Sequence, residues 1–438
     1  MVRHRDPITG GHGTRFRLFA QDPVLEAFRE PETVWISRAA GTVAPGPADE
    51  RMYVVDAIGK PGPYEYPYLP PYVGPARPPA MPSPDGHFDH LEVGSPAFRA
   101  AHMYATVRRV LDIWESYAGG RIEWHFRRAY DRLELVPYVE WANAQAGFGF
   151  IETGYARDEH GEPRLHWQNF DVLAHELGHL LIYSQVGTPA PATRTDQYVG
   201  FHESAADLVA LVGCLHFHTV VDHVLRRSAG NLYYLTELSR IGELSETAQL
   251  RIADNDLRMS DVEDLSTSRD LSCALHELAQ PLTGAVFDIF VDVYQQNLVD
   301  AGLISAELDH ASGRVSGILV DDPAIEARFG SAYEGRHDAF KAVLMQTRDY
   351  MGTGLVHTWR RLSPHHLNYL DVLGTLLSVD RELTGGRYAQ TIRESFAWRE
   401  IDSGLTAPRP TSLLGARRGI AGRPLPTKAA RPPRRSRA

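Results

Sequence analysis

The sequence of 438 residues predicts an α+β protein of two lobes, a mixed β and α lobe followed by an all-helical lobe. Three observations support this prediction. Short β-like stretches separated by Pro and Gly occupy the first part of the chain, and helical periodicity dominates the second. The hydrophobic content of 43% in a chain of this length is enough to form cores of substantial size.

The N-terminal part begins with strand-like segments. Residues 14–57 contain Thr33–Ile36 and Met52–Val55, which are β-like and bounded by Pro and Gly. Residues 61–86 are too rich in Pro, Tyr and Gly for a helix or a central strand. We expect an extended arm that lies on the body and is anchored by its aromatic side chains; a disordered linker is the open alternative.

The first long helix has a clear start signal. Ser95 supplies an N-cap oxygen and Pro96 has the φ angle that suits the first helical position, so we expect a helix that runs to Tyr117. After it, the residue types favour strands at Ile122–Phe126 and Leu133–Val139.

A second helix is expected from about Asn169 to Gln185, because the apolar pattern ends at Gly187. The pattern behind it is mainly helical. The expected helices cover about 201–227, 229–240, 271–300, 322–347, 363–381 and 385–397. The segment after Asp402 is rich in Pro, Arg and Ala and is expected to be disordered.

These changes in composition divide the chain into four predicted parts. They are a β-rich segment with the arm (1–92), a mixed α/β lobe that carries the helix 169–185 (93–190), a helical lobe (191–402) and a basic tail (403–438).

Two histidines on the second helix form the most informative motif. His175 and His179 are four positions apart, so a helix projects both imidazoles from one face, where they can hold a metal ion. Glu176 is offset by about 100° and can reach a water on that metal instead of ligating it. The HExxH pattern also arises by chance, and most chance copies are solvated helix faces.

A second acidic motif strengthens this interpretation. Glu203 and Asp207 lie one helical turn apart among Ala and Leu, where an unpaired carboxylate is costly. Glu203 would complete a His₂Glu site, and Asp207 could accept the second ring N–H of His175 or His179. The open alternative is an amphipathic helix whose acids face water.

Together these motifs resemble the thermolysin-like zinc metallopeptidases, the gluzincins, whose pattern is HExxH followed by ExxxD on a second helix. The resemblance implies a two-lobed zincin-like metallopeptidase with the zinc helix between the lobes. It also implies one Zn²⁺ per chain, held by His175, His179 and Glu203 with a fourth position open for water. Glu176 would be the general base that acts on a peptide or protein substrate.

Three further segments occur in the family's order. The segment that begins with Asn143 and Ala144 is similar to the edge strand that binds the substrate backbone. Arg258 lies in a segment that resembles the family's Arg-containing turn, where it would hold a substrate carbonyl. His276 opens a segment that resembles the one beginning with the family's transition-state histidine.

The oxyanion formed in peptide hydrolysis needs donors besides the metal. His276 is the first candidate, Tyr198 the second and Tyr183 a weaker one. Each has a plain alternative, because either tyrosine could be a packing aromatic and His276 could face water. Arg258 could equally form a surface salt bridge. The family's Asn before the glutamate ligand is His202 in this chain, and we expect His202 not to be a ligand.

Composition excludes several other classes. The net charge is −10, and residues 403–438 carry nine basic residues and no acid, which leaves about −19 for the body and argues against nucleic acid as its partner. No apolar run reaches ~18 residues, so no membrane span is expected. The start of the chain lacks the apolar core of a secretory signal, which favours a cytoplasmic protein.

Cys214 and Cys273 are expected to be buried free thiols. The sequence does not indicate the oligomeric state.

Two other functions stay open. An aminopeptidase of the same clan is the nearer one, although the Trp-Leu-Asn-Glu-Gly-style second helix of those enzymes is missing. The other is a zinc-stabilised binding or scaffold protein without catalysis. Glu176 argues against it, because a structural site needs no proton acceptor and usually closes its fourth position with a protein ligand.

Overall fold

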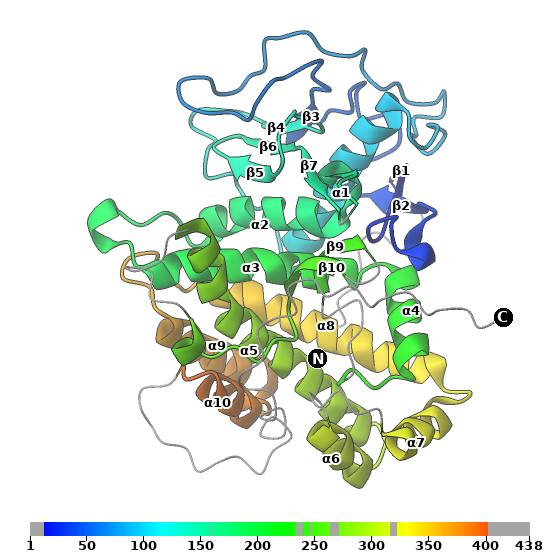
Figure 1. The fold of residues 1–438 in the computed structure, drawn as a ribbon, viewed down its shortest axis with the longest axis vertical. Coiled ribbons are helices and arrows are strands. Elements are labelled where there is room, and N and C mark those ends of the chain that lie inside the picture. The colour runs from blue at the N-terminus through cyan, green and yellow to red at the C-terminus, as the bar shows by residue number, and fades with distance from the viewer. Residues whose placement is uncertain are drawn as a thin grey trace, which may run out of the picture.

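The computed structural model describes residues 13–158, 160–233, 240–245, 248–262, 271–315 and 322–401, and the predicted basic tail lies outside them. The protein is a mixed α/β fold in which helices predominate (Figure 1). Within the described residues the strands form one four-stranded sheet and three two-stranded sheets. A continuous hydrophobic cluster extends from Phe16 to Ile401, so both halves of the chain contribute to one core.

The N-terminal hairpin packs on the first long helix. Strands β1 (Thr14–Leu18) and β2 (Glu32–Ile36) are antiparallel, and both contact α1 (Pro96–Tyr117). The side chain of Ser95 accepts a hydrogen bond from the Phe98 amide at 3.1 Å. The predicted start and end of this helix are therefore confirmed.

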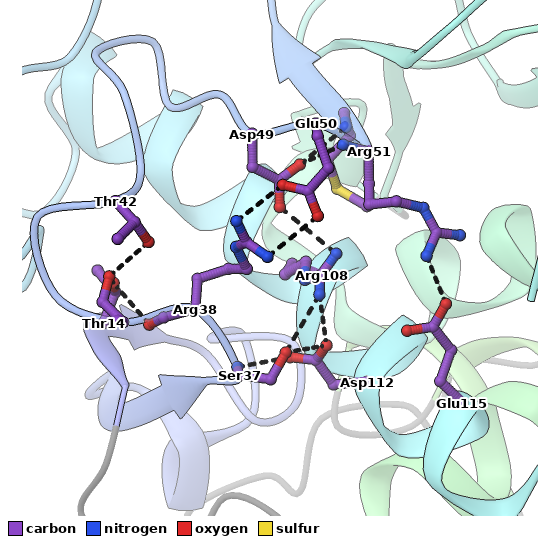
Figure 2. A network of polar contacts seen from close by, with 12 residues as sticks. Thr14, Ser37, Arg38, Thr42, Asp49, Glu50, Arg51, Arg108, Asp112 and Glu115 are labelled. Atoms are coloured by element: carbon purple, nitrogen blue, oxygen red, sulfur yellow. Dashed lines mark hydrogen bonds and ion pairs between the residues drawn. The ribbon is translucent and has the colours of Figure 1, made fainter. Parts of the chain in front are cut away.

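A buried polar network fastens the hairpin to α1 (Figure 2). Arg108 pairs with Asp112 at 2.9 Å and with Asp49 at 3.4 Å. The Ser37 hydroxyl at the end of β2 also donates to Asp112, at 2.6 Å. Because buried charges are tolerated only when they are paired, these contacts fix how the N-terminal segments lie on the helix.

The four-stranded sheet has the order β3-β4-β6-β5. Strands β3 (Met52–Val54), β4 (Leu133–Val136) and β6 (Phe150–Thr153) are parallel. Strand β5 (Ala144–Gly147) is antiparallel to β6 and forms one edge of the sheet. One face of the sheet contributes side chains such as Leu135 to the main core.

The predicted strand at Ile122–Phe126 is wrong. Ile122, Trp124 and Phe126 are all buried, yet this segment belongs to no sheet. The carbonyl of Ile122 accepts a hydrogen bond from the Arg51 guanidinium instead of from a neighbouring strand. The alternation of apolar residues therefore reflected burial and not strand pairing.

Residues 61–86 form an extended arm on the other face of the sheet. Glu134 of β4 accepts a hydrogen bond from the Tyr64 hydroxyl. Glu152 of β6 accepts one from Lys60 at 2.7 Å and another from the Tyr64 amide. Both carboxylates are fully buried. Tyr64 is thus an aromatic anchor of the kind that the sequence predicted, whereas Tyr66 and Tyr68 are largely exposed.

Three helices form the centre of the molecule. Helix α2 (Phe170–Gln185) contacts α3 (Asp196–Cys214), which in turn contacts α5 (Leu271–Asp300) (Figure 1). Asn169 caps α2 by accepting from the Val172 amide at 3.1 Å, so the predicted helix 169–185 is confirmed. The expected helix 271–300 is confirmed as α5.

The other elements surround this centre. The remaining helices are α4 (His218–Ser228), α6 (Ala306–Val315), α7 (Pro323–Tyr333), α8 (His337–Trp359), α9 (Tyr369–Thr384) and α10 (Ala389–Trp398). The remaining strands form two hairpins, β7 (Tyr155–Arg157) with β8 (Pro163–Leu165) and β9 (Arg240–Ser245) with β10 (Ala248–Ile252). Short 3-10 helices occur at Glu26–Phe28, His166–Gln168, Pro191–Thr193 and Met259–Asp261.

Several predicted helices are interrupted. The range 201–227 is divided between α3 and α4, whose axes differ by 89°. The bend is held by tertiary contacts, because His216 pairs with the Tyr117 hydroxyl at 2.8 Å and Phe217 packs edge-on against Phe170. Such contacts leave no local sequence signal, which is why the break was not predicted.

The predicted helix 229–240 is wrong where the structure describes it. Ala229 has a left-handed φ of 48°, which ends α4, and Arg240 already belongs to β9. Residues 234–239 lie outside the described residues. The range 322–347 is likewise two helices, because Gly335 takes a φ of 70° between α7 and α8.

Two smaller predictions concern membranes and cysteines. Among the described helices none is by itself long and apolar enough to cross a bilayer, whereas the bent pair α3 and α4 meets the length and composition test jointly. Cys214 is buried and free, as expected, and the side chain of Cys273 lies outside the described residues.

Candidate metal centre

Side chains from two neighbouring helices converge at one point. His175 and His179 lie on one face of α2, and Glu203 faces them from α3. The Nε2 atom of His175 is 3.4 Å from Glu203 Oε2, and that of His179 is 3.8 Å from Glu203 Oε1. One ligand atom from each of the three side chains lies within 4.8 Å of the other two.

The close packing of α2 and α3 depends on a glycine. A Cβ atom at Gly178 would lie 2.7 Å from the Cα of Ala206, closer than such atoms approach in folded proteins. Gly178 stands between the two histidines, and Ala206 stands between Glu203 and Asp207. The small residues therefore bring the two helices close enough for the three side chains to meet.

The donor set fits zinc. Zinc binds imidazole nitrogen and carboxylate oxygen at about 2.0–2.2 Å, which separates ligand atoms of a tetrahedral site by about 3.3–3.5 Å. The contacts of 3.4 and 3.8 Å are close to that spacing. Within the described part of the chain, His175, His179 and Glu203 are the one group of His, Cys, Asp and Glu side chains that meets the distance criterion for a metal ion.

The second ring nitrogens of the two histidines have different partners. His175 Nδ1 is 2.8 Å from Asp207 Oδ1, and Asp207 is fully buried. His179 Nδ1 is 2.9 Å from the Nδ1 atom of His202. Asp207 thus lies where the sequence predicted an acceptor, whereas the contact between His179 and His202 was not foreseen.

His276 also reaches the centre. Its Nε2 atom lies 3.2 Å from Glu203 Oε2, and 40% of its side chain is exposed. It comes from the early part of α5, far along the chain from the other groups. His276 is outside the three-residue ligand group, so it approaches the carboxylate without sharing the candidate metal position.

The surrounding histidines change the ionisation of Glu203. Burial by itself would raise the pKa of this carboxyl, but the charge of His179 and the hydrogen bonds of His175 and His276 outweigh it. The pKa of Glu203 is therefore held well below its usual value. An ionised carboxylate is the form that binds a metal cation.

The other predicted catalytic residues lie on the same two helices. Glu176 follows His175 on α2 and is buried. The hydroxyl of Tyr198 on α3 donates to the carbonyl of Gly187 at 2.8 Å, so it is engaged away from the ligand group. The ring of Tyr183 lies 4.2 Å from that of His202, and burial raises the pKa of its hydroxyl.

The predicted substrate-binding residues occupy two different places. Ala144 begins the edge strand β5, and Asn143 directly precedes it. Arg258 instead lies over the ring of Trp398 at 4.7 Å and 3.9 Å from Glu400. These contacts match the surface salt bridge that was the alternative for Arg258.

Sequence reasoning missed an aromatic row beside the centre. His125 lies 5.5 Å from Phe148 and 5.1 Å from Tyr183, and Tyr183 contacts His202. Phe148 is exposed in the turn between β5 and β6. His125, Phe148, Tyr183 and His202 come from four separate segments without a shared period, so no pattern in the sequence marks them.

Comparisons with known proteins give little further information. No protein-family model matches this chain, and no curated protein matches it. Among solved structures, a precursor of protealysin, a metalloproteinase from Serratia proteamaculans, is similar over 67% of this chain and 88% of its own, with 14% identity and a TM-score of 0.37. A likeness this weak assigns neither a family nor an activity to the protein.

Proposed function

We propose that the protein is a zinc-dependent peptide hydrolase. The observation that carries the proposal is the convergence of His175, His179 and Glu203 within 4.8 Å, from two helices whose sequence carries HExxH and ExxxD. Glu176 is the second argument, because a purely structural site has no use for a carboxylate beside its ligands. We propose one zinc ion per chain and a peptide or protein as the substrate.

A zinc ion held by His175, His179 and Glu203 would supply a Lewis acid for a water molecule and a substrate carbonyl. Glu176 would accept the proton from the attacking water on its carboxylate and later deliver it to the leaving nitrogen. Its burial on α2 favours this role, because proton transfer is efficient when bulk water does not compete for the base.

His276 is the proposed donor to the oxyanion. Its Nε2 atom lies beside Glu203, and its side chain is exposed enough to meet a bound substrate. Loss of one such donor typically costs about 2.7–4 kcal/mol of barrier. Tyr198 is the weaker candidate, because its hydroxyl would first have to leave the Gly187 carbonyl.

The edge of the sheet is the proposed docking place for the substrate backbone. β5 is at the end of the strand order and contacts α2, so a peptide added beside it would run close to the ligand group. Main-chain bonds to Asn143 and Ala144 would give affinity with little sequence discrimination. A peptide docked along this edge could extend past the metal centre in both directions, so an endopeptidase is the preferred type of enzyme. An aminopeptidase with the same zinc-dependent reaction is the alternative.

The proposal is tested by Glu176→Gln. We expect the variant to keep about one zinc per chain and to lose peptide hydrolysis by about 10²–10⁴-fold, because the amide cannot accept the proton. Zinc is measured by elemental analysis and hydrolysis by cleavage of a mixed peptide library. Glu277→Gln is the matched control, since Glu277 is an exposed acid that directly follows His276.

Two results would contradict the proposal. Unchanged hydrolysis in Glu176→Gln would remove the proposed base. Stoichiometric zinc with no cleavage of any library peptide by the wild-type protein would favour the zinc-stabilised binding protein instead.

A further inference from the structure

We propose that His202 is a positioning residue that sets the tautomer and the ring orientation of His179 for metal binding. The inference rests on the proposed zinc site and assigns a role to a residue that does not ligate the metal. His202 precedes Glu203, so α3 supplies both a ligand and the partner of a ligand on α2.

The two imidazoles are placed for one direct hydrogen bond. Their rings are nearly parallel, with an interplanar angle of 6° and centroids 4.8 Å apart. Their Nδ1 atoms are 2.9 Å apart, a normal N–H···N distance. One of these two nitrogens must therefore carry a hydrogen and the other must accept it.

The candidate metal position decides which nitrogen donates. The Nε2 atom of His179 faces Glu203, so this is the nitrogen whose lone pair must be free for a cation. A neutral His179 then carries its proton on Nδ1 and donates it to Nδ1 of His202. His202 in turn must carry its own proton on Nε2.

The surroundings of His202 hold it in this orientation. It is 5% exposed, and its ring lies against Tyr183 at 4.2 Å and against Tyr198 at 5.9 Å. Its Nε2 atom is buried without a hydrogen-bond partner among the described residues. The Nδ1 contact with His179 is therefore the hydrogen bond that joins this buried ring to the side chain of a proposed ligand.

The two ligand histidines are consequently supported by groups of different charge. Asp207 places a carboxylate behind His175, whereas His202 places a neutral ring behind His179. A neutral partner orients the ligand without adding negative charge to the centre. A cation held here would therefore keep more of its positive charge than it would with two carboxylates behind its ligands.

The test compares two substitutions of the same shape. In His202→Asn the amide oxygen stands at the position of Nδ1 and can accept the same hydrogen bond, whereas His202→Leu puts a methyl group there. We expect the leucine variant to bind Zn²⁺ about 10–100-fold more weakly and the asparagine variant to stay within a few fold of the wild type. The affinity for zinc alone is measured by competition with a chromogenic chelator.

A control separates this effect from general damage. His216→Leu also removes a buried imidazole, one that pairs with Tyr117 at 2.8 Å and not with a ligand. We expect this variant to lose stability while its zinc affinity remains unchanged. The kcat and KM of zinc-loaded protein are measured in parallel, and we expect both to recover in His202→Asn.

The outcomes distinguish this inference from the proposed function. Zinc affinity in His202→Leu equal to that of wild type would overturn the positioning role and leave the hydrolase proposal standing. Equal weakening in His202→Asn and His202→Leu would also overturn it, because the acceptor would then be irrelevant. A wild-type protein that binds no zinc would remove the proposed function itself.

Discussion

At the scale of single residues, the candidate centre is defined by where each nitrogen and oxygen can point. His175, His179 and Glu203 each direct one ligand atom to the same place, and each histidine is supported through its other nitrogen. These contacts limit the orientations that the side chains of the centre can take. Such restriction is what a catalytic metal site requires, because a misplaced ligand weakens both binding and activity.

Glu203→Ala should remove the metal without unfolding the protein. The substitution deletes the one anionic ligand, whereas the hydrophobic core that holds α2 and α3 does not depend on it. We expect less than about a tenth of the wild-type zinc content at equal free zinc, with an unchanged far-ultraviolet circular dichroism spectrum. Full zinc retention would place the third ligand elsewhere, and Asp196→Ala at the start of α3 serves as the control.

At the scale of elements, the distance between α2 and α3 governs the site. Gly178 is the contact point, because its missing side chain leaves room for the backbone of Ala206. The HExxH motif specifies which face of α2 carries ligands. It does not specify that the next helix must approach this face so closely.

Gly178→Ala should therefore destabilise the protein, although alanine is the better helix former by about 1 kcal/mol. The added methyl group would overlap backbone atoms of α3, and overpacking of this kind costs about 1–3 kcal/mol. We expect a lower urea midpoint and weaker zinc binding, since α3 carries Glu203. Gly374→Ala is the control, because a Cβ there meets nothing within 4 Å. A stabilised Gly178→Ala variant would contradict the described packing.

The arm is a second element whose position depends on a few buried groups. Lys60→Met should release it, because Glu152 would be left as a buried charge without its cation. Breaking such a pair costs about 3–5 kcal/mol. We expect new protease cleavage within residues 61–86 and a corresponding loss of stability. The control is Arg38→Met, which breaks the exposed pair with Glu50 and should change the free energy of unfolding by less than about 1 kcal/mol. Equal losses of stability in Lys60→Met and Arg38→Met would contradict the role of Lys60 as an anchor of the arm.

At the scale of the whole molecule, one core joins segments from both ends of the chain. A smaller cluster of Phe19, Phe98 and Trp167 surrounds His102 on α1. His102 is fully buried there, and its Nε2 atom accepts a hydrogen bond from the Phe19 amide at 3.1 Å. Burial lowers the pKa of His102 to about 3, against 6.5 for an unperturbed histidine. Folding is therefore coupled to the protonation of this ring.

The sign of the effect follows from proton binding. Above pH 6.5 His102 is neutral in both states and contributes nothing, whereas below it the unfolded chain binds a proton that the folded chain does not. The free energy of unfolding should thus fall by about 1.4 kcal/mol between pH 7.5 and pH 5.5 on account of this group. In His102→Gln, which keeps an acceptor but cannot be protonated, this part of the slope should disappear. Urea unfolding at both pH values, with a chelator present, measures it, and an unchanged slope would refute the assignment.

Much of the fold was predictable because its signals are local. Ser95 and Asn169 cap the helices that they were expected to begin, and Tyr64 is one aromatic of the arm that does anchor it. The break after Cys214 and the absence of a strand at Ile122–Phe126 were not predictable. Both depend on partners far away in the chain, such as Tyr117 and Arg51.

The sequence by itself determined which metal-binding side chains are available, because helical spacing is enough to place His175 and His179 on one face of α2. Only the tertiary structure decided how that chemistry is assembled. It pairs His179 with His202, directs the Tyr198 hydroxyl to Gly187 and brings His276 to Glu203. The physical reason is that periodicity and capping act within a few residues, whereas hydrogen-bond partners across helices are selected by the packing of the entire core.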